Sequence, residues 1–314
     1  MPLVWLSDID IVMPPTVVET FEAHRSKLVG LAYRITGSIA EAEDIAQETF
    51  LKWMDVDHET IQSPNSWLVT VATRMSLDHL KSARIQRESY IGPWLPEPYI
   101  ADNKTPQNEH ELDESITMAL LVLLEQLSPG ERASFILHDI FHFNFDEIGE
   151  ILDKTGAACR KLASRARGKI DKDAIQHNPN KQDHLEIVSA FFGAVKKGDM
   201  TELVSLLREN VILHADGGGK ALAALEILEG LETVAAFLLK KVAPSFATVD
   251  SADTAITHVW FNGSPGFVIW VDAKPVSAFN FEIEDHMIKR IHALRNPDKL
   301  RFFNGHFGQV IKMA

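Results

Sequence analysis

The segment from Ser128 to Ile170 ends in a cluster of positive charge on an otherwise acidic chain. The 314 residues carry a formal net charge of −13, yet residues 154–172 contain one acid, Asp171, and seven bases: Lys154, Arg160, Lys161, Arg165, Arg167, Lys169 and Lys172. A positive face confined to one segment is typical of a protein that contacts phosphates at that place. The pattern predicts a local DNA-binding element and argues against general coating of nucleic acid.

Capping residues divide this segment into helices joined by tight turns. Ser128, Pro129 and Glu131 supply an N-cap, a proline at the first helical position and a capping box. Asn144 and Glu147 repeat the capping-box spacing, and Thr155 can cap the last helix. The spacing therefore predicts helix-turn-helix units.

In the last helix, small and apolar residues recur every four positions, and we expect them to face the core: Ala158, Leu162, Ala166 and Ile170. The remaining faces carry Arg160, Lys161, Ser164, Arg165 and Arg167. A recognition helix needs this division, because long donors must reach base edges and phosphates in the major groove. The alternative is a solvated helix of an ordinary bundle.

Length and composition set outer limits. The length suggests two or three domains of about 150 residues each, and a hydrophobic content of 46% excludes general disorder. A single cysteine, Cys159, excludes an internal disulfide and fits a reducing cytoplasm. We expect it to pack in the core, with redox sensing as the alternative. No apolar run predicts a membrane span, and the first twelve residues lack the basic residues of a signal peptide.

Residues 17–90 are predicted to be helical throughout. Ser38 and Glu41 cap a helix that presents an acidic face, made of Glu43, Asp44, Gln47 and Glu48. Ser63 and Pro64 open a second helix that becomes basic toward its end. Four prolines between residues 91 and 108 then predict a linker.

In this order, these elements resemble the sigma-70 family of transcription initiation factors, and most closely its extracytoplasmic-function (ECF) class. Segment 43–53, EDIAQETFLKW, is similar to the region 2 helix that binds core RNA polymerase. Segment 66–87 is similar to the helix that melts and recognises the −10 promoter element, and segment 127–167 to region 4, which recognises the −35 element. The likeness covers about residues 14–175.

The resemblance implies a role for individual residues. The expected polymerase contacts are Asp44, Gln47 and Glu48. Those expected on the −10 side are Arg74, Lys81, Arg84 and Arg87, with the loop 55–62 placed to capture a flipped base. Those expected on the −35 side are Arg160, Lys161, Ser164, Arg165 and Arg167. Core RNA polymerase and promoter DNA are thus the implied partners.

A third part of the chain begins near Asp183 and is predicted to contain three helices followed by antiparallel strands. Phe279, Phe281 and Ile283 alternate with polar residues, which is the period of a half-buried strand. This order resembles the cone-shaped SnoaL-like fold. Relatives with that fold include isomerases, so His214 and Asp216 could form an acid–base pair. The rival hypothesis is therefore a DNA-binding module fused to a small-molecule-binding or isomerase-like cone.

Three motifs resemble those of the ECF subgroup with a fused SnoaL-like domain. They are WLPEP (Trp94, Leu95, Pro96, Glu97 and Pro98), DGGGK (Asp216, Gly217, Gly218, Gly219 and Lys220) and NPDKL (Asn296, Pro297, Asp298, Lys299 and Leu300). The subgroup implies regulation in cis by the third domain. We expect the glycine turn to receive Trp94 and so clamp the linker; the alternative is that the motifs only stabilise the local fold.

The sequence thus predicts two all-α domains followed by an α+β SnoaL-like domain, in a cytoplasmic protein without catalytic activity of its own. The expected boundaries are 14–90, a linker at 91–111, 112–175 and 183–305. His138 and His142 have a metal-ligand spacing but lack further ligands, so we expect structural histidines, no metal and no cofactor. Whether the cone binds a small molecule stays open.

Overall fold

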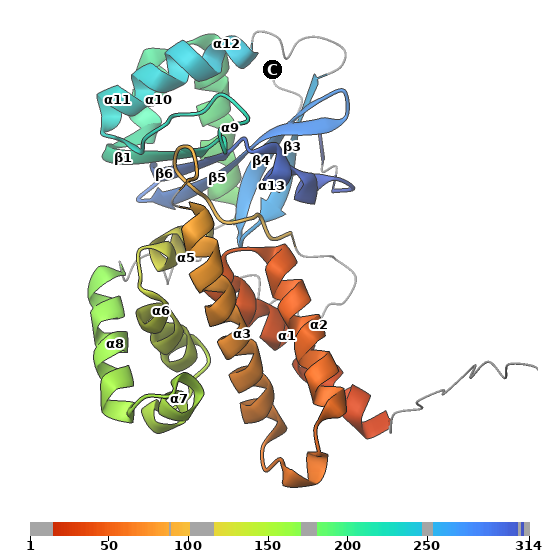
Figure 1. The fold of residues 1–314 in the computed structure, drawn as a ribbon. Coiled ribbons are helices and arrows are strands. Elements are labelled where there is room, and N and C mark those ends of the chain that lie inside the picture. The colour runs from red at the N-terminus through yellow and green to blue at the C-terminus, as the bar shows by residue number, and fades with distance from the viewer. Residues whose placement is uncertain are drawn as a thin grey trace, which may run out of the picture.

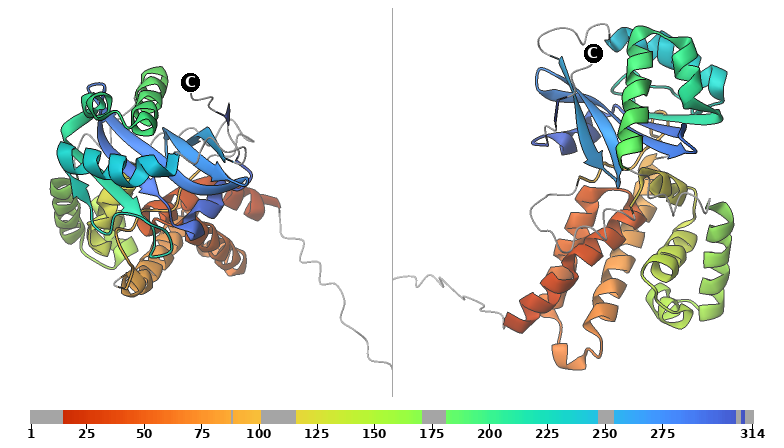
Figure 2. Two further views of the ribbon diagram at one scale, coloured as in Figure 1. Left: turned by 90° about the horizontal axis from the view of Figure 1, so that it is seen from above. Right: turned by 180° about the vertical axis from the view of Figure 1, so that it is seen from behind.

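The computed structural model describes residues 15–87, 89–100, 116–170, 181–246, 254–306 and 309–310. The predicted linker residues 101–111, the side chains of Arg84 and Arg87, and Lys172 lie outside the described part. The described residues form an N-terminal domain (α1–α3), a middle domain (α5–α8) and a C-terminal domain (α9–β7). The N-terminal and middle domains lie side by side, and the C-terminal domain sits across the same end of both (Figures 1 and 2).

The first two domains are entirely helical. The N-terminal domain consists of α1 (Pro15–Thr36), α2 (Ile39–Asp55), the short 3₁₀ turn η1 (His58–Thr60) and α3 (Pro64–Arg87). The middle domain consists of α5 (Met118–Glu125), α6 (Pro129–Phe135), the π-helix η2 (Ile136–Ile140), α7 (Phe145–Leu152) and α8 (Gly156–Lys169). Both predicted capping boxes are confirmed, at Ser128 with Glu131 and at Asn144 with Glu147.

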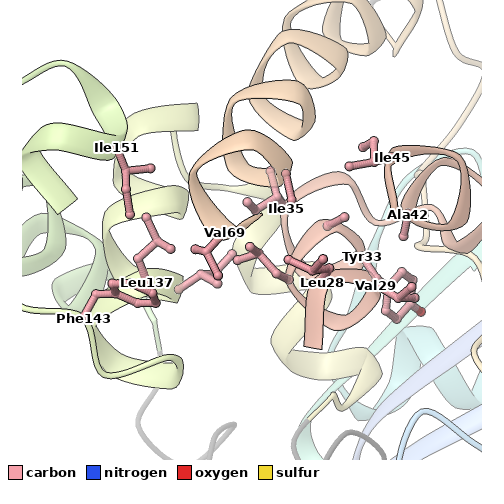
Figure 3. Packing of buried hydrophobic residues seen from close by; sticks show 14 of the residues in the cluster. Leu28, Val29, Tyr33, Ile35, Ala42, Ile45, Val69, Leu137, Phe143 and Ile151 are labelled. Atoms are coloured by element: carbon pink, nitrogen blue, oxygen red, sulfur yellow. The ribbon is translucent and has the colours of Figure 1, made fainter. Parts of the chain in front are cut away.

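These two domains share one hydrophobic core. Val69 of α3 lies between Ile35 of α1 on one side and Leu137 and Phe143 of the middle domain on the other (Figure 3). The fully buried Arg132 of α6 reinforces this contact, because its guanidinium donates to the carbonyl of Ile35 over 2.6 Å. A continuous apolar core of this kind holds the two helical domains in one arrangement.

The C-terminal domain is a mixed sheet covered by helices. The helices are α9 (Lys181–Lys197), α10 (Met200–Leu206), α11 (Leu231–Phe237), the π-helix η4 (Leu238–Val242), α12 (Ala243–Phe246), α13 (Pro297–Leu300) and the 3₁₀ turn η5 (Arg301–Phe303). The strands are β1 (Leu207–Asp216), β2 (Leu228–Glu229), β3 (Thr254–Phe261), β4 (Ser264–Val271), β5 (Lys274–Glu284), β6 (Met287–Leu294) and β7 (Gln309–Val310).

The strand order is β2-β1-β6-β5-β4-β3-β7. The predicted fold class, two all-α domains and an α+β SnoaL-like domain, is confirmed. The last long strands pair antiparallel as predicted, whereas β1, which precedes them, pairs with β6 in parallel, so the sheet is mixed. The parallel pair arises because α10 and β1 precede the meander, so β1 enters the sheet beside its last long strand.

Both faces of the sheet are buried, and successive side chains along a strand point alternately to one face and to the other. Phe267 and Ile269 of β4 pack into the inner core under α9 and α11, whereas Val268 and Trp270 pack into an outer core. Figure 2 shows α9 lying against the inner face. The outer core also contains Leu95 of the linker and Met118 of α5. The outer face of the sheet is thus where the C-terminal domain meets the rest of the chain.

Candidate functional site

The three sequence motifs meet around the buried carboxylate of Asp216, at the end of β1. Asp216 is fully buried and accepts from the Tyr90 hydroxyl over 2.5 Å, from the backbone N–H of Leu95 over 2.9 Å, and from Nζ of Lys299 over 2.7 Å. A buried carboxylate is stable only when its charge is paired and its oxygens accept hydrogen bonds. Two of these three partners, Tyr90 and Leu95, come from the segment that follows α3.

Lys299 completes this junction from α13. Asn296 caps that helix and Pro297 occupies its first position, so the backbone directs Lys299 inward. Its ammonium donates to Asp216 and to the carbonyl of Leu95, and it lies 4.1 Å from the centre of the Trp94 ring. An ammonium above an indole face adds a cation–π attraction. Lys299 therefore binds the linker through the Leu95 carbonyl and the Trp94 ring, while its charge pairs with Asp216.

The glycine turn receives Tyr90 and Ile91, so the expectation that it receives Trp94 was wrong. Gly218 and Gly219 have φ angles of +58° and +69°, which favour glycine. A Cβ at Gly218 would lie 3.0 Å from the Tyr90 hydroxyl, and one at Gly219 would lie 2.8 Å from Ile91 Cδ1. The turn needs glycine for both backbone conformation and close approach.

Trp94 packs instead on the N-terminal domain. A Cβ at Gly37, which follows α1, would lie 2.6 Å from the edge of the Trp94 ring. The indole is thus held between Gly37 on one side and Lys299 on the other. The residue expected to clamp the linker therefore also joins two domains.

Glu97 anchors the other end of the WLPEP segment to the N-terminal domain. Its carboxylate accepts from the Ser38 hydroxyl over 2.8 Å and from the Ala40 N–H over 3.3 Å, at the start of α2. Its N–H donates to the carbonyl of Gly37 over 2.9 Å. A carboxylate at a helix N-terminus is favoured by the free N–H groups and the helix dipole. Sequence reasoning missed this role, since the start of α2 was expected to be capped by Ser38 and Glu41 alone.

A second tie joins the C-terminal and N-terminal domains directly. The side chain of Asn262, in the turn after β3, donates to the Tyr33 hydroxyl over 2.8 Å. Its Oδ1 accepts from the backbone N–H of Tyr99, and its own backbone N–H donates to the Tyr99 carbonyl. The Tyr33 hydroxyl in turn donates to the carbonyl of Glu97. Burial raises the pKa of Tyr33, so its hydroxyl stays protonated and remains a donor. No sequence signal marked Asn262, whose φ of +48° suits the tight turn.

Helix α8 presents part of the predicted basic face to solvent. Arg160, Lys161, Ser164 and Arg165 are exposed, and within the described residues none of the three cations has an acidic partner. Arg167 departs from the prediction, because its guanidinium forms a bidentate pair with Asp139 at 2.8 and 2.9 Å. The predicted buried stripe is confirmed at Ala166 and Ile170, whereas in the first half of the helix Cys159 and Ala163 are buried and Ala158 and Leu162 are only partly covered.

The two histidines with metal-ligand spacing have separate environments. His138 stacks on Phe145 with ring centres 4.2 Å apart and accepts from Arg167 over 3.0 Å. His142 has a φ of +61° in the turn that follows η2. His138 thus serves packing, as expected.

The predicted −10 residue Arg74 is engaged by the middle domain. Its Nε donates to the carbonyl of Ile151 and its Nη2 to the carbonyl of Glu150, both over 2.9 Å. These are the free carbonyls at the end of α7, where a cation is favoured by the helix dipole. Lys81, further along the same helix α3, is exposed and pairs with Asp78. The middle domain thus covers part of the predicted −10 face.

The predicted polymerase face of α2 is open. Asp44, Gln47 and Glu48 are exposed and follow one another along the helix, and Leu51 extends the same face with 58% of its surface exposed. A single exposed leucine is ordinary on a protein surface, so what marks Leu51 is its place beside the predicted polymerase contacts. Leu51 was missed because the sequence pattern alone does not separate it from the buried stripe of Ile45 and Trp53.

His214 and Asp216 cannot act as an acid–base pair inside the cone. Leu213 and Ala215 of β1 point into the inner core, so His214 and Asp216 point to the outer face. There His214 bonds to the backbone of Trp94, and burial lowers its pKa to about 4. The neighbouring His292 is also buried and its pKa is lowered further below the usual range. His214 and Asp216 therefore both contact the linker, and neither is available as a catalytic residue of an isomerase.

Comparison with known proteins identifies the family of the chain. Residues 20–85 match the family model for sigma-70 region 2 and residues 117–170 match that for sigma-70 region 4. The ECF RNA polymerase sigma factor SigJ of Mycobacterium tuberculosis is 40% identical over 225 residues, 71% of this chain and 72% of SigJ. The chain belongs to the ECF RNA polymerase sigma factors.

Two further comparisons extend the likeness beyond the sigma regions. The probable ECF sigma factor SigI of M. tuberculosis is 31% identical over 286 residues, 90% of this chain and 94% of SigI. The crystal structure of M. tuberculosis SigJ matches with a TM-score of 0.70 at 33% identity, over 92% of this chain and 98% of SigJ. This sigma factor therefore shares with SigJ an architecture that includes the C-terminal domain, and its family acts in transcription initiation rather than as enzymes.

The two family models correspond to structural units. The region 2 match spans α1 to α3, and the region 4 match spans α5 to α8. The junction around Asp216 lies outside both matches, between the linker and the C-terminal domain. Within the described ranges we find no helix with the length and hydropathy needed to span a bilayer.

Proposed function

We propose that this sigma factor directs core RNA polymerase to a −35/−10 promoter, and that the arrangement described here is its restrained state. The proposed polymerase contacts are Asp44, Gln47, Glu48 and Leu51 of region 2. The proposed DNA contacts are Arg74, Lys81, Arg84 and Arg87 of region 2, and Arg160, Lys161, Ser164 and Arg165 of region 4. This role places the chain in the cytoplasm, with domain boundaries near those expected from the sequence.

The bond between Arg74 and the end of α7 carries the proposal of restraint. DNA rises 3.4 Å per base pair, so elements about 25 base pairs apart are separated by about 85 Å along the helix axis. Region 4 touches region 2 at Arg74 with hydrogen bonds of 2.9 Å. Two domains in such contact cannot span that separation. Promoter binding therefore requires regions 2 and 4 to part.

The C-terminal domain is placed to oppose that separation. It holds the linker through Asp216 and Lys299, touches region 2 through Asn262, and packs on region 4 through Met118. Opening the molecule must break some of these contacts. The C-terminal domain would thereby regulate the sigma regions of its own chain, because any change that weakens the linker junction raises the fraction of molecules able to bind both promoter elements.

Run-off transcription with core polymerase tests this proposal. We expect full-length Lys299→Met to give several-fold more promoter-specific RNA than the wild type at limiting sigma factor. The control is Lys220→Met, which removes an exposed pair with Asp298 in the same motifs and should leave the yield unchanged. Equal or lower yield from Lys299→Met, with the linker released, would contradict restraint by the C-terminal domain.

A further inference from the structure

The inner face of the C-terminal sheet encloses a cavity that the sigma-factor role does not use. It lies between β1, β4, β5 and β6 on one side and α11 with η4 on the other, and Leu213, Phe237, Ile269 and Phe279 line its interior. The free space inside is about 40 Å³, and the cavity is open to solvent on one side. A space of this size is too small for a ring, and it admits a slender chain only if the side chains that line it shift.

Two cations stand at this cavity without acidic partners. Lys241 belongs to the π-helix η4 and is exposed, and Arg295 follows β6 and is half-buried. Within the described residues neither forms an ion pair. The Nε of Arg295 is buried without an acceptor, and burial lowers the pKa of the guanidinium. An apolar cavity with two such cations matches a ligand that has an apolar chain and an anionic head.

The cavity is connected to the linker junction through Arg295. The backbone N–H of Arg295 donates to the carbonyl of Asp216 over 2.7 Å, and its Nη1 donates to the carbonyl of Leu222 over 2.6 Å. Leu222 and Ala223 also line the cavity and follow the glycine turn. Ala224 and Leu225, next in the chain, lie against Gly92 of the linker. A molecule in the cavity would therefore contact the loop that supports the linker.

We propose that this cavity binds a small amphipathic carboxylate, and that the bound molecule strengthens the docking of the linker. The carboxylate pairs with Lys241 and with the guanidinium of Arg295, while the apolar chain enters between Phe237 and Phe279. Because Nη1 keeps its bond to Leu222, the ligand fixes Arg295 and the 221–225 loop in the conformation that receives the linker. A ligand that binds only this conformation raises its population.

The binding half of the proposal is tested by titrating octanoate into the full-length protein by calorimetry, without polymerase. We expect saturable binding of one molecule, and weaker binding of uncharged octan-1-ol. Lys241→Gln should weaken octanoate binding about fivefold, as expected for loss of a partly exposed ion pair, and Arg295→Gln should weaken it further. Lys240→Gln, at an exposed neighbour outside the cavity, should have no effect.

The coupling half, which rests on the proposed restraint, is tested by hydrogen exchange of peptide 91–99. Octanoate should slow exchange of the Leu95 amide, which donates to Asp216, in the wild type but not in Arg295→Gln. No saturable binding, or equal binding by Lys241→Gln and the wild type, would overturn the site. Binding without slower Leu95 exchange would overturn the coupling. Neither result depends on transcription, so failure here is distinguishable from failure of the restraint proposal.

Discussion

At the scale of single residues, the buried pair of Asp216 and Lys299 decides whether the linker is held. Both side chains are almost fully removed from solvent, with exposed fractions of 0% and 7%. The spacing of the DGGGK and NPDKL motifs could not show that they would meet, because Asp216 and Lys299 lie 83 residues apart. What the sequence did show was that the three motifs occur together, as in the subgroup that they resemble.

Removing the ammonium should release the linker. In Lys299→Met the carboxylate of Asp216 stays buried with its charge unpaired, which costs about 3–5 kcal/mol. We expect the Leu95 amide to exchange at least tenfold faster by mass spectrometry, whereas Lys220→Met should leave it unchanged. Retained protection in Lys299→Met would mean that Tyr90 and the backbone alone hold the linker.

Lowering the pH should weaken the docking of the linker on the C-terminal domain. Burial lowers the pKa of His214 to about 4, whereas an exposed histidine has a pKa near 6.5. The released state therefore binds a proton that the docked state does not, and docking is lost progressively as the pH falls from about 6.5 toward 4. At pH 5.5 the loss from His214 is about 1.4 kcal/mol.

The groups facing His214 are Asp216, Lys299, His292 and the backbone of Trp94. His292 is buried with a lowered pKa and adds to the loss in the same direction. Leu95 exchange, corrected for the intrinsic rate at each pH, measures the effect. His214→Gln should flatten the pH dependence; an unchanged profile would assign it to His292 alone.

At the scale of elements, local sequence signals predicted where helices begin, whereas the buried face of a helix or strand depended on packing against the rest of the chain. The caps at Ser128, Asn144 and Thr155 form as expected because they depend on neighbouring residues only. The buried stripe was predicted correctly at Ala166 and Ile170 but was displaced by one position in the first half of α8, since a helix of small residues offers several possible faces. Alternation in β5 was visible at Phe279, Phe281 and Ile283, but which of the two faces of the strand enclosed the cavity depends on helices distant in the chain.

Promoter binding should depend on the exposed cations of α8. Arg165→Ala should weaken binding of a −35 duplex by the polymerase holoenzyme by about 1–3 kcal/mol if the guanidinium contacts a base. Arg167→Ala should act mainly on stability, because Arg167 is paired with Asp139. Fluorescence anisotropy and thermal unfolding separate the two, and equal affinity for wild type and Arg165→Ala would move recognition elsewhere.

Polymerase binding should depend on the apolar end of the α2 face. Leu51→Asp should reduce the affinity for core polymerase at least tenfold without changing the unfolding temperature, because Leu51 is exposed. Met200→Asp, at an exposed apolar position of the C-terminal domain, is the matched control. Equal affinity of Leu51→Asp and the wild type would exclude this face as a main contact.

At the scale of the whole molecule, the arrangement of domains was beyond sequence reasoning. Arg74 and Ile151 are 77 residues apart, and the contact joins the middle of α3 to the end of α7, which local patterns do not relate. The sequence indicated that two DNA-binding halves exist and that a third domain is attached. Only the structure brings the halves together, through the shared core around Val69 and the linker held at Asp216.

The distance between regions 2 and 4 in solution tests the closed arrangement most directly. Spin labels at Glu59→Cys and Lys154→Cys, both exposed positions, in a Cys159→Ala background report it by double electron–electron resonance. We predict one short distance in the free full-length protein, and a much longer one after core polymerase and promoter DNA are added. A free protein that already shows the long distance would contradict the account.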